Sequence, residues 1–130
     1  MQVKEPTPEV DLLARAVIDA AVEVHRHIGP GFLESVYEEA LAVELRLRKI
    51  PFERQRTIAI SYKEHSVGEG RVDIVVGGSL LVELKAVEAL APIHKAQVIS
   101  YLKATKLTLG LLINFNVPVL MQGVQRIVLS

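Results

Sequence analysis

The chain has 130 residues, half of them apolar, with 15 basic residues, 15 acidic residues and no cysteine. This length suits one domain over residues 1–130 with a sizeable core, and this composition excludes a disordered chain or a strongly basic tail. The lack of cysteine excludes disulfides, thiol catalysis and cysteine-bound zinc, and it is compatible with the cytoplasmic location that we expect. The N-terminal residues have no apolar signal core and no apolar run is long enough to cross a bilayer, so we expect no membrane partner.

Two helices are predicted in the first 50 residues. Thr7-Pro8 has the residue types of a helix start, and apolar residues then recur at helical spacing from Val10 to Ile28. His25 and His27 point to different sides of this helix, so we interpret them as helix-end or surface residues rather than metal ligands.

Gly29-Pro30-Gly31 ends the first helix, and the second is expected from about Leu33 to Lys49. Glu34 lies in its first turn, where an acid compensates the helix dipole without any further role. The apolar face of this helix is predicted to use Val36, Tyr37, Ala40, Leu41, Leu45 and Leu47.

Strands are predicted in the middle and at the end of the chain. The alternation from Phe52 to Tyr62 indicates a strand, and two arginines in its first half favour an exposed or edge position. The second strand starts near Val67 and the third is Leu80–Lys85. A helix from about Ile93 to Ala104 and two more strands, Lys106–Asn114 and Val124–Leu129, complete the chain. This order predicts an α/β fold with a mixed sheet of about five strands flanked by helices, in which the third helix joins parallel neighbours.

Three charged residues interrupt the apolar strands between Val72 and Lys85. Asp73 lies in the first of these strands, and Glu83 and Lys85 lie on one face of the second. A buried charge is costly unless it is paired or binds a metal. A three-residue loop, Gly77–Ser79, sets Asp73 opposite Glu83 with Cβ atoms about 5 Å apart, whereas a two-residue loop puts them on opposite faces. We predict the longer loop, which allows the two carboxylates to share a divalent cation.

These residues also have structural interpretations. Glu83 and Lys85 could form an ion pair on one strand face, and Asp73 could pair with Arg71. Gln97 and Tyr101 are four apart on the third helix and therefore share a face. Gln97 could simply cap this helix face, and Tyr101 could simply be a core residue.

Three motifs carry a resemblance to a known family. Asp73 followed by Glu83-Leu84-Lys85 fits a D…E-x-K core, and Gln97-Val-Ile-Ser-Tyr101 matches the Q-x-x-x-Y motif of RecB-type nucleases. Gly31-Phe-Leu-Glu34-Ser-Val-Tyr37 matches a G-x-x-E-x-x-Y signature. On these residues the chain resembles the PD-(D/E)XK nuclease superfamily, and within it the GxxExxY family, along nearly its whole length.

The resemblance implies a restriction-endonuclease-like fold and metal-dependent hydrolysis of phosphodiester bonds in DNA or RNA. Asp73 and Glu83 would bind Mg²⁺ or Mn²⁺, hard cations that prefer oxygen ligands. Glu34 would be an additional acidic ligand and the Leu84 carbonyl a further one. Lys85 would position the attacking water, and Gln97 and Tyr101 would contact phosphate or orient Lys85.

A second function from another class remains open at this point. The chain could be a catalytically inactive nucleic-acid-binding or protein-interaction module that keeps the fold. Balanced charge favours this alternative, because DNA binders usually carry more lysine and arginine. A homodimer or a partner protein could supply the missing positive surface. Every residue that the resemblance assigns to the site is present, which favours catalysis.

Overall fold

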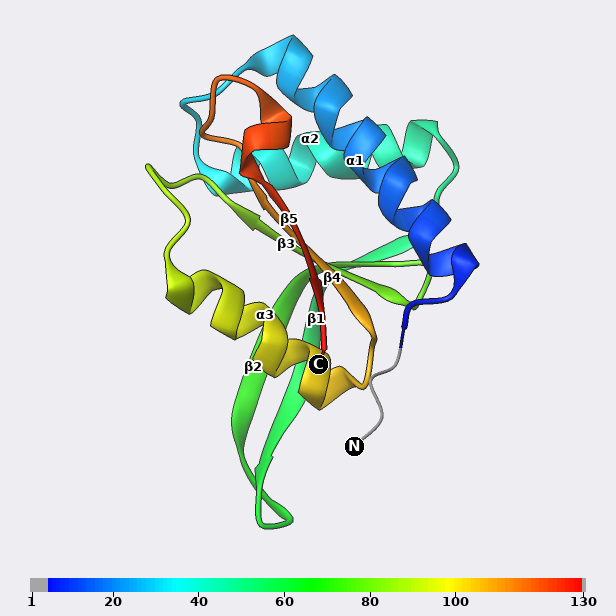
Figure 1. The fold of residues 1–130 in the computed structure, drawn as a ribbon, viewed down its shortest axis with the longest axis vertical. Helices are drawn as coiled ribbons and strands as arrows, with labels where there is room; N and C mark the ends of the chain where they lie inside the picture. The colour runs from blue at the N-terminus through cyan, green and yellow to red at the C-terminus, as the bar shows by residue number, and fades with distance from the viewer. Residues whose placement is uncertain (1–4, 130) are drawn as a thin grey trace.

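The computed structural model describes residues 5–129 as three helices packed on a twisted sheet (Figure 1). The helices are α1 (Pro8–Ile28), α2 (Glu34–Leu47) and α3 (Pro92–Thr105), with a short 3-10 helix η1 (Leu120–Gly123). The strands are β1 (Phe52–Tyr62), β2 (His65–Val76), β3 (Leu80–Lys85), β4 (Leu109–Asn114) and β5 (Val124–Val128). None of the helices in residues 5–129 has the length and apolar character needed to span a bilayer.

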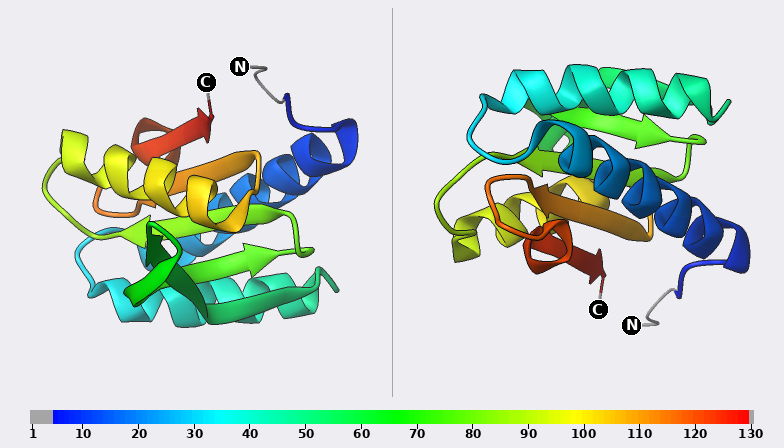
Figure 2. Two further views of the ribbon diagram at one scale, coloured as in Figure 1. Left: turned by 90° about the horizontal axis from the view of Figure 1, so that it is seen from below. Right: turned by 90° about the horizontal axis from the view of Figure 1, so that it is seen from above.

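The five strands lie in the order of the sequence, β1-β2-β3-β4-β5. Only β3 and β4 are parallel, and α3 connects them, as the alternation of elements predicts. Helices α1 and α2 cover one face of the sheet and α3 covers the other (Figure 2). The architecture is therefore the α/β mixed sheet predicted from the sequence.

The turn between β2 and β3 has the predicted three-residue loop. Val76 pairs with Leu80 and Ile74 with Val82, so the continuing register places Asp73 opposite Glu83. The loop begins with two glycines at positive φ, 59° at Gly77 and 70° at Gly78. Glycine adopts this conformation without strain, which accounts for the pair of glycines at the start of the loop.

The turn before α2 is held by Tyr37, whose side chain is fully buried. Its hydroxyl donates to the Gly29 carbonyl at 2.7 Å and accepts from the Phe32 amide at 3.2 Å. Its ring stacks on Phe115 with centroids 4.5 Å apart. The start of α2, and with it Glu34, is thus fixed to the core.

The structure differs from the sequence predictions on the faces of α2. Val36 and Leu47 were predicted on the apolar face, but they are exposed, with Leu47 at 73%. Glu38 is buried instead, at 8% exposure. A buried carboxylate is tolerated here because Arg54 and Gln55 bond to it.

Other differences concern strand ends. Strand β2 begins earlier than predicted, at His65, so that β1 and β2 form a long hairpin that projects beyond the rest of the fold (Figure 1). Strand β4 begins later, at Leu109, because Lys106 takes the left-handed conformation that caps α3. His25 lies in the last turn of α1, as expected, but it is buried rather than at the surface, with Nε2 2.8 Å from the Val117 carbonyl oxygen.

Candidate metal centre

The carboxylates of Asp73 and Glu83 meet where the β2–β3 ladder ends. Beyond the Ile74–Val82 pair, side chains replace backbone carbonyls as hydrogen-bond acceptors. The Asp73 amide donates to Glu83 Oε1 at 3.0 Å, and the Leu84 amide donates to Asp73 Oδ2 at 2.8 Å. Each acid therefore reaches across to the other strand, and Glu83 is only 3% exposed.

Burial and mutual repulsion make this pair hard to ionise. Burial raises the pKa of Glu83 to about 8, with the charge of Asp73 as the next cause. The pKa of Asp73 is also raised, first by burial, with a further contribution from the charge of Glu38. Two such acids need either a bound proton or a cation close by. Hard carboxylate oxygens so placed fit Mg²⁺ or Mn²⁺.

Lys85 extends this group towards α3. Its Nζ donates to Gln97 Oε1 at 3.2 Å, and Gln97 Nε2 donates to the Tyr101 hydroxyl at 3.4 Å. Tyr101 in turn lies against β2, because a Cβ added at Gly70 would be 2.9 Å from its ring. The two motif residues on α3 thus form one chain of contacts that ends at Lys85.

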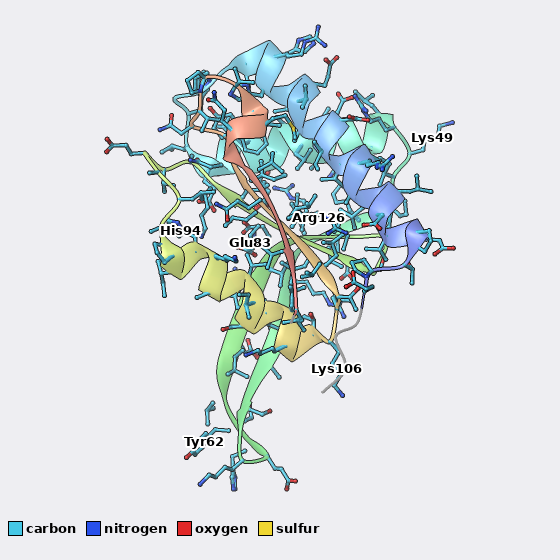
Figure 3. The ribbon with its side chains drawn as sticks, in the orientation of Figure 1. Lys49, Tyr62, Glu83, His94, Lys106 and Arg126 are labelled. Carbon is cyan, nitrogen blue, oxygen red and sulfur yellow. The ribbon has the colours of Figure 1, made fainter. Side chains whose placement is uncertain are left out.

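The structural interpretations of the charged residues lack their expected contacts. Among the ion pairs within residues 5–129, none joins Glu83 to Lys85 or Asp73 to Arg71. Glu83, which is labelled in Figure 3, is buried, and none of these ion pairs includes it. Its burial is therefore not explained by a salt bridge.

Glu34 is the first residue of α2 and approaches the pair from another element. Although the residue is exposed, burial of part of its carboxyl raises the pKa of Glu34, with the charge of Asp73 as the next cause. The positive charge of Lys85 lowers the pKa of Glu34. The start of α2 is therefore within electrostatic range of both Asp73 and Lys85.

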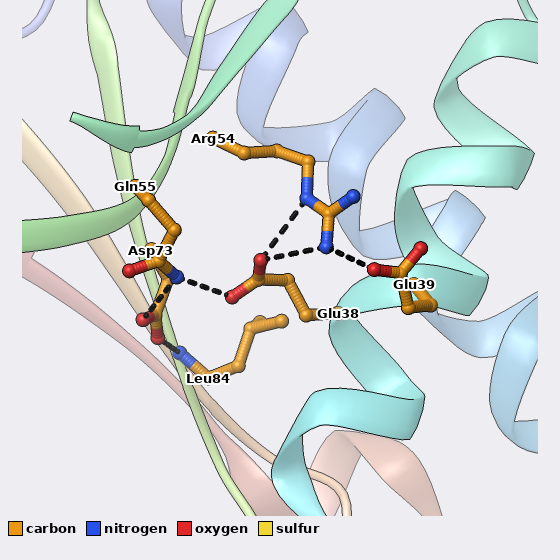
Figure 4. A network of polar contacts seen from close by, with 6 residues as sticks. All are labelled: Glu38, Glu39, Arg54, Gln55, Asp73 and Leu84. Carbon is orange, nitrogen blue, oxygen red and sulfur yellow. Dashed lines mark hydrogen bonds and ion pairs between the residues drawn. The ribbon is translucent and has the colours of Figure 1, made fainter.

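Two polar residues beside Asp73 were not predicted from the sequence. Glu38, one turn after Glu34, accepts from Arg54 Nε at 3.0 Å and from Gln55 Nε2 at 2.7 Å. Gln55 also donates to Asp73 Oδ1 at 3.4 Å, so the network connects α2 to the pair (Figure 4). The i, i+4 spacing of Glu34 and Glu38 was the available signal, since such residues share a helix face.

The predicted ligands are brought together only in part. Within residues 5–129, no three acidic or histidine side chains are arranged to hold an ion. Asp73 and Glu83 each turn one oxygen onto a backbone amide of the other strand. Leu84 contributes its amide to Asp73 in this arrangement.

The fold and the carboxylate pair with its lysine define an α/β domain of the restriction-endonuclease type. A model of the PD-(D/E)XK nuclease superfamily matches residues 11–127. The chain belongs to this superfamily, whose nucleases usually use divalent metals. No curated protein and no solved structure matches the chain.

Proposed function

We propose that the protein is a metal-dependent nuclease of the GxxExxY family that hydrolyses phosphodiester bonds, with DNA as the favoured substrate and RNA as the other. The observation that carries the proposal is the pair Asp73 and Glu83, cross-bonded between β2 and β3, in which Asp73 is half-buried and Glu83 is buried, with Lys85 on the same strand as Glu83. A half-buried and a buried acid side by side without a salt bridge are costly in a scaffold and useful in a metal centre.

Asp73 and Glu83 hold Mg²⁺ or Mn²⁺ in this proposal, with Glu34 and the Leu84 carbonyl as further ligands. The bound ion would stabilise charge on the phosphoryl oxygens and favour ionisation of a water. Lys85 positions the attacking water and stabilises the negative charge that develops on the phosphate. Gln97, backed by Tyr101, holds the Lys85 ammonium in place through the contact at 3.2 Å.

A positive helix beside the site supports a nucleic acid as substrate. Helix α3 contains no acidic residue, and it presents the exposed Lys95 and Lys103 on the element that also carries Gln97 and Tyr101. Cationic side chains of this kind contact the phosphate backbone. Because the chain has no net charge, we propose that a second copy or a partner protein adds positive surface. We expect this activity in the cytoplasm.

An inactive binding module is the alternative function, and one experiment separates the two. Purified protein is incubated with linear, circular and single-stranded DNA and with RNA, in Mg²⁺, Mn²⁺ or EDTA. The proposal expects metal-dependent cleavage that Lys85→Ala abolishes, while Lys63→Ala, a change at the distant hairpin turn, leaves it intact. Substrate binding without cleavage in any metal would support the inactive module. Equal cleavage by Lys85→Ala would place the activity elsewhere.

A further inference from the structure

The most unusual backbone in the sheet lies beside Asp73. Gln55 has φ +53° in the middle of β1, a conformation that side chains other than glycine and asparagine rarely adopt in a strand. The pairing register is unchanged around it, with Arg54 opposite Ile74 and Arg56 opposite Val72. The strain is therefore not the by-product of an inserted residue, and such strain persists where the surrounding structure enforces it.

At this position, residues of one parity in β2 change from one side of the sheet to the other. Ile74 and Val76 are two apart in the strand and therefore lie on one face, where both pack in the core under α1 and α2. Val72 has the same parity, yet it packs in the core under α3. The change of face falls at Asp73, directly opposite Gln55.

The side chain of Gln55 then bonds to two acids at once. Its amide nitrogen is 2.7 Å from Glu38 Oε1 and 3.4 Å from Asp73 Oδ1 (Figure 4). Glu38 is itself held by Arg54, so it acts as a fixed acceptor. With the Leu84 amide on Oδ2, both oxygens of Asp73 have a donor, which sets the plane of its carboxylate.

We propose that Gln55 is a positioning residue that orients Asp73 for the metal ion, and that its left-handed backbone is the device that places it there. A neutral amide suits this task, because it directs the carboxylate without cancelling the charge that attracts a cation. An arginine or lysine at the same place would compete with the ion. This inference rests on the proposed function.

The partners of metal ligands affect metal affinity by about 10–100-fold when they are changed. We therefore expect Gln55→Gly to bind Mn²⁺ about 10–100-fold more weakly than the wild type. Glycine adopts the same backbone without strain, but it also removes one donor from the buried Glu38. Gln55→Ala loses the same donor and keeps the strained backbone, so it should melt lower in EDTA than Gln55→Gly. A residue with a merely structural role would lower the melting temperature and leave the metal affinity unchanged.

The test measures Mn²⁺ affinity by electron paramagnetic resonance and melting in EDTA. The matched control is Lys106→Gly, which also places glycine at a positive φ, 63°, but at the far end of α3 from Glu83 (Figure 3). Gln55→Asn tolerates the left-handed backbone with a shorter side chain, and it is the second variant if the glycine variant does not fold. It should also bind Mn²⁺ more weakly.

The results of these measurements distinguish failure of the inference about Gln55 from failure of the proposed function. Wild-type affinity in the folded Gln55 variants overturns the inference, as does a loss that Lys106→Gly shares. A Gln55→Ala variant that melts no lower in EDTA than Gln55→Gly overturns the role of the strain. Wild-type protein that binds no Mn²⁺, or binds it equally with Asp73→Asn, overturns the proposed function and the inference with it.

Discussion

The metal-free protein should lose stability as the pH rises through neutrality. The pKa of Glu83 is about 8 in the folded protein, against 4.5 for an ordinary glutamate, because the carboxyl is buried beside Asp73. Between these two values the folded state binds more protons than the unfolded state, so the free energy of unfolding falls with rising pH. At 1.36 kcal/mol for each pKa unit, the full shift corresponds to a loss of at most ~5 kcal/mol. The raised pKa values of Asp73 and Glu34 act in the same direction.

Urea unfolding in EDTA between pH 5 and pH 9 measures this loss. Glu83→Gln is the matched variant, because glutamine can still accept from the Asp73 amide but never ionises. Its profile should be flatter than that of the wild type, and at pH 9 it should be the more stable protein by up to ~5 kcal/mol. A wild type that gains stability from pH 5 to pH 8 would refute the reasoning. So would a Glu83→Gln variant that is less stable at pH 9, the result expected for a broken ion pair.

Three further changes test other parts of the account. Asp73→Asn should lose most of the rise in melting temperature that Mn²⁺ gives the wild type, because the ion binds only the folded state; an equal rise would exclude Asp73 as a ligand. Tyr37→Phe should lower the free energy of unfolding in urea by about 1–3 kcal/mol, since its buried hydroxyl makes two hydrogen bonds; no loss would mean that the turn before α2 is held otherwise. The double change Lys95→Glu, Lys103→Glu should weaken binding of fluorescent DNA and flatten its salt dependence, whereas Lys63→Glu at the hairpin turn should not; equal effects would place the DNA elsewhere.

The register of the central hairpin could be predicted because it depends on local rules. Once Gly77–Ser79 is taken as a three-residue loop, which was preferred over a two-residue loop because it lets the two carboxylates share a cation, the pairing of strand residues sets Asp73 opposite Glu83. The crossover by α3 between parallel strands also follows from the order of elements. These features need no knowledge of contacts between distant segments.

The surroundings of Asp73 could not be predicted, because they depend on such contacts. Glu38 comes from a helix and Gln55 from an edge strand, and each is unremarkable in its own segment. Their meeting requires α2 to pack with Glu38 inward, which leaves Val36 exposed. The helical pattern correctly predicted Tyr37, Leu41 and Leu45 as buried, but it placed Val36 on that face and gave no reason to bury Glu38. The positive φ of Gln55 could not be predicted either, because glutamine has no preference for this conformation.

The central claim is that Asp73 and Glu83 hold a divalent cation, and anomalous scattering from a crystal grown with Mn²⁺ tests it most directly. One strong peak should lie between the two carboxylates, with oxygen atoms of both about 2.1 Å away, close to the distance that Mg²⁺ takes in proteins. Glu83 should then have turned from the Asp73 amide towards the ion, while Asp73 keeps its contacts with Gln55 and the Leu84 amide. Carboxylates that keep both amide contacts in Mn²⁺, with no peak between them, would contradict it.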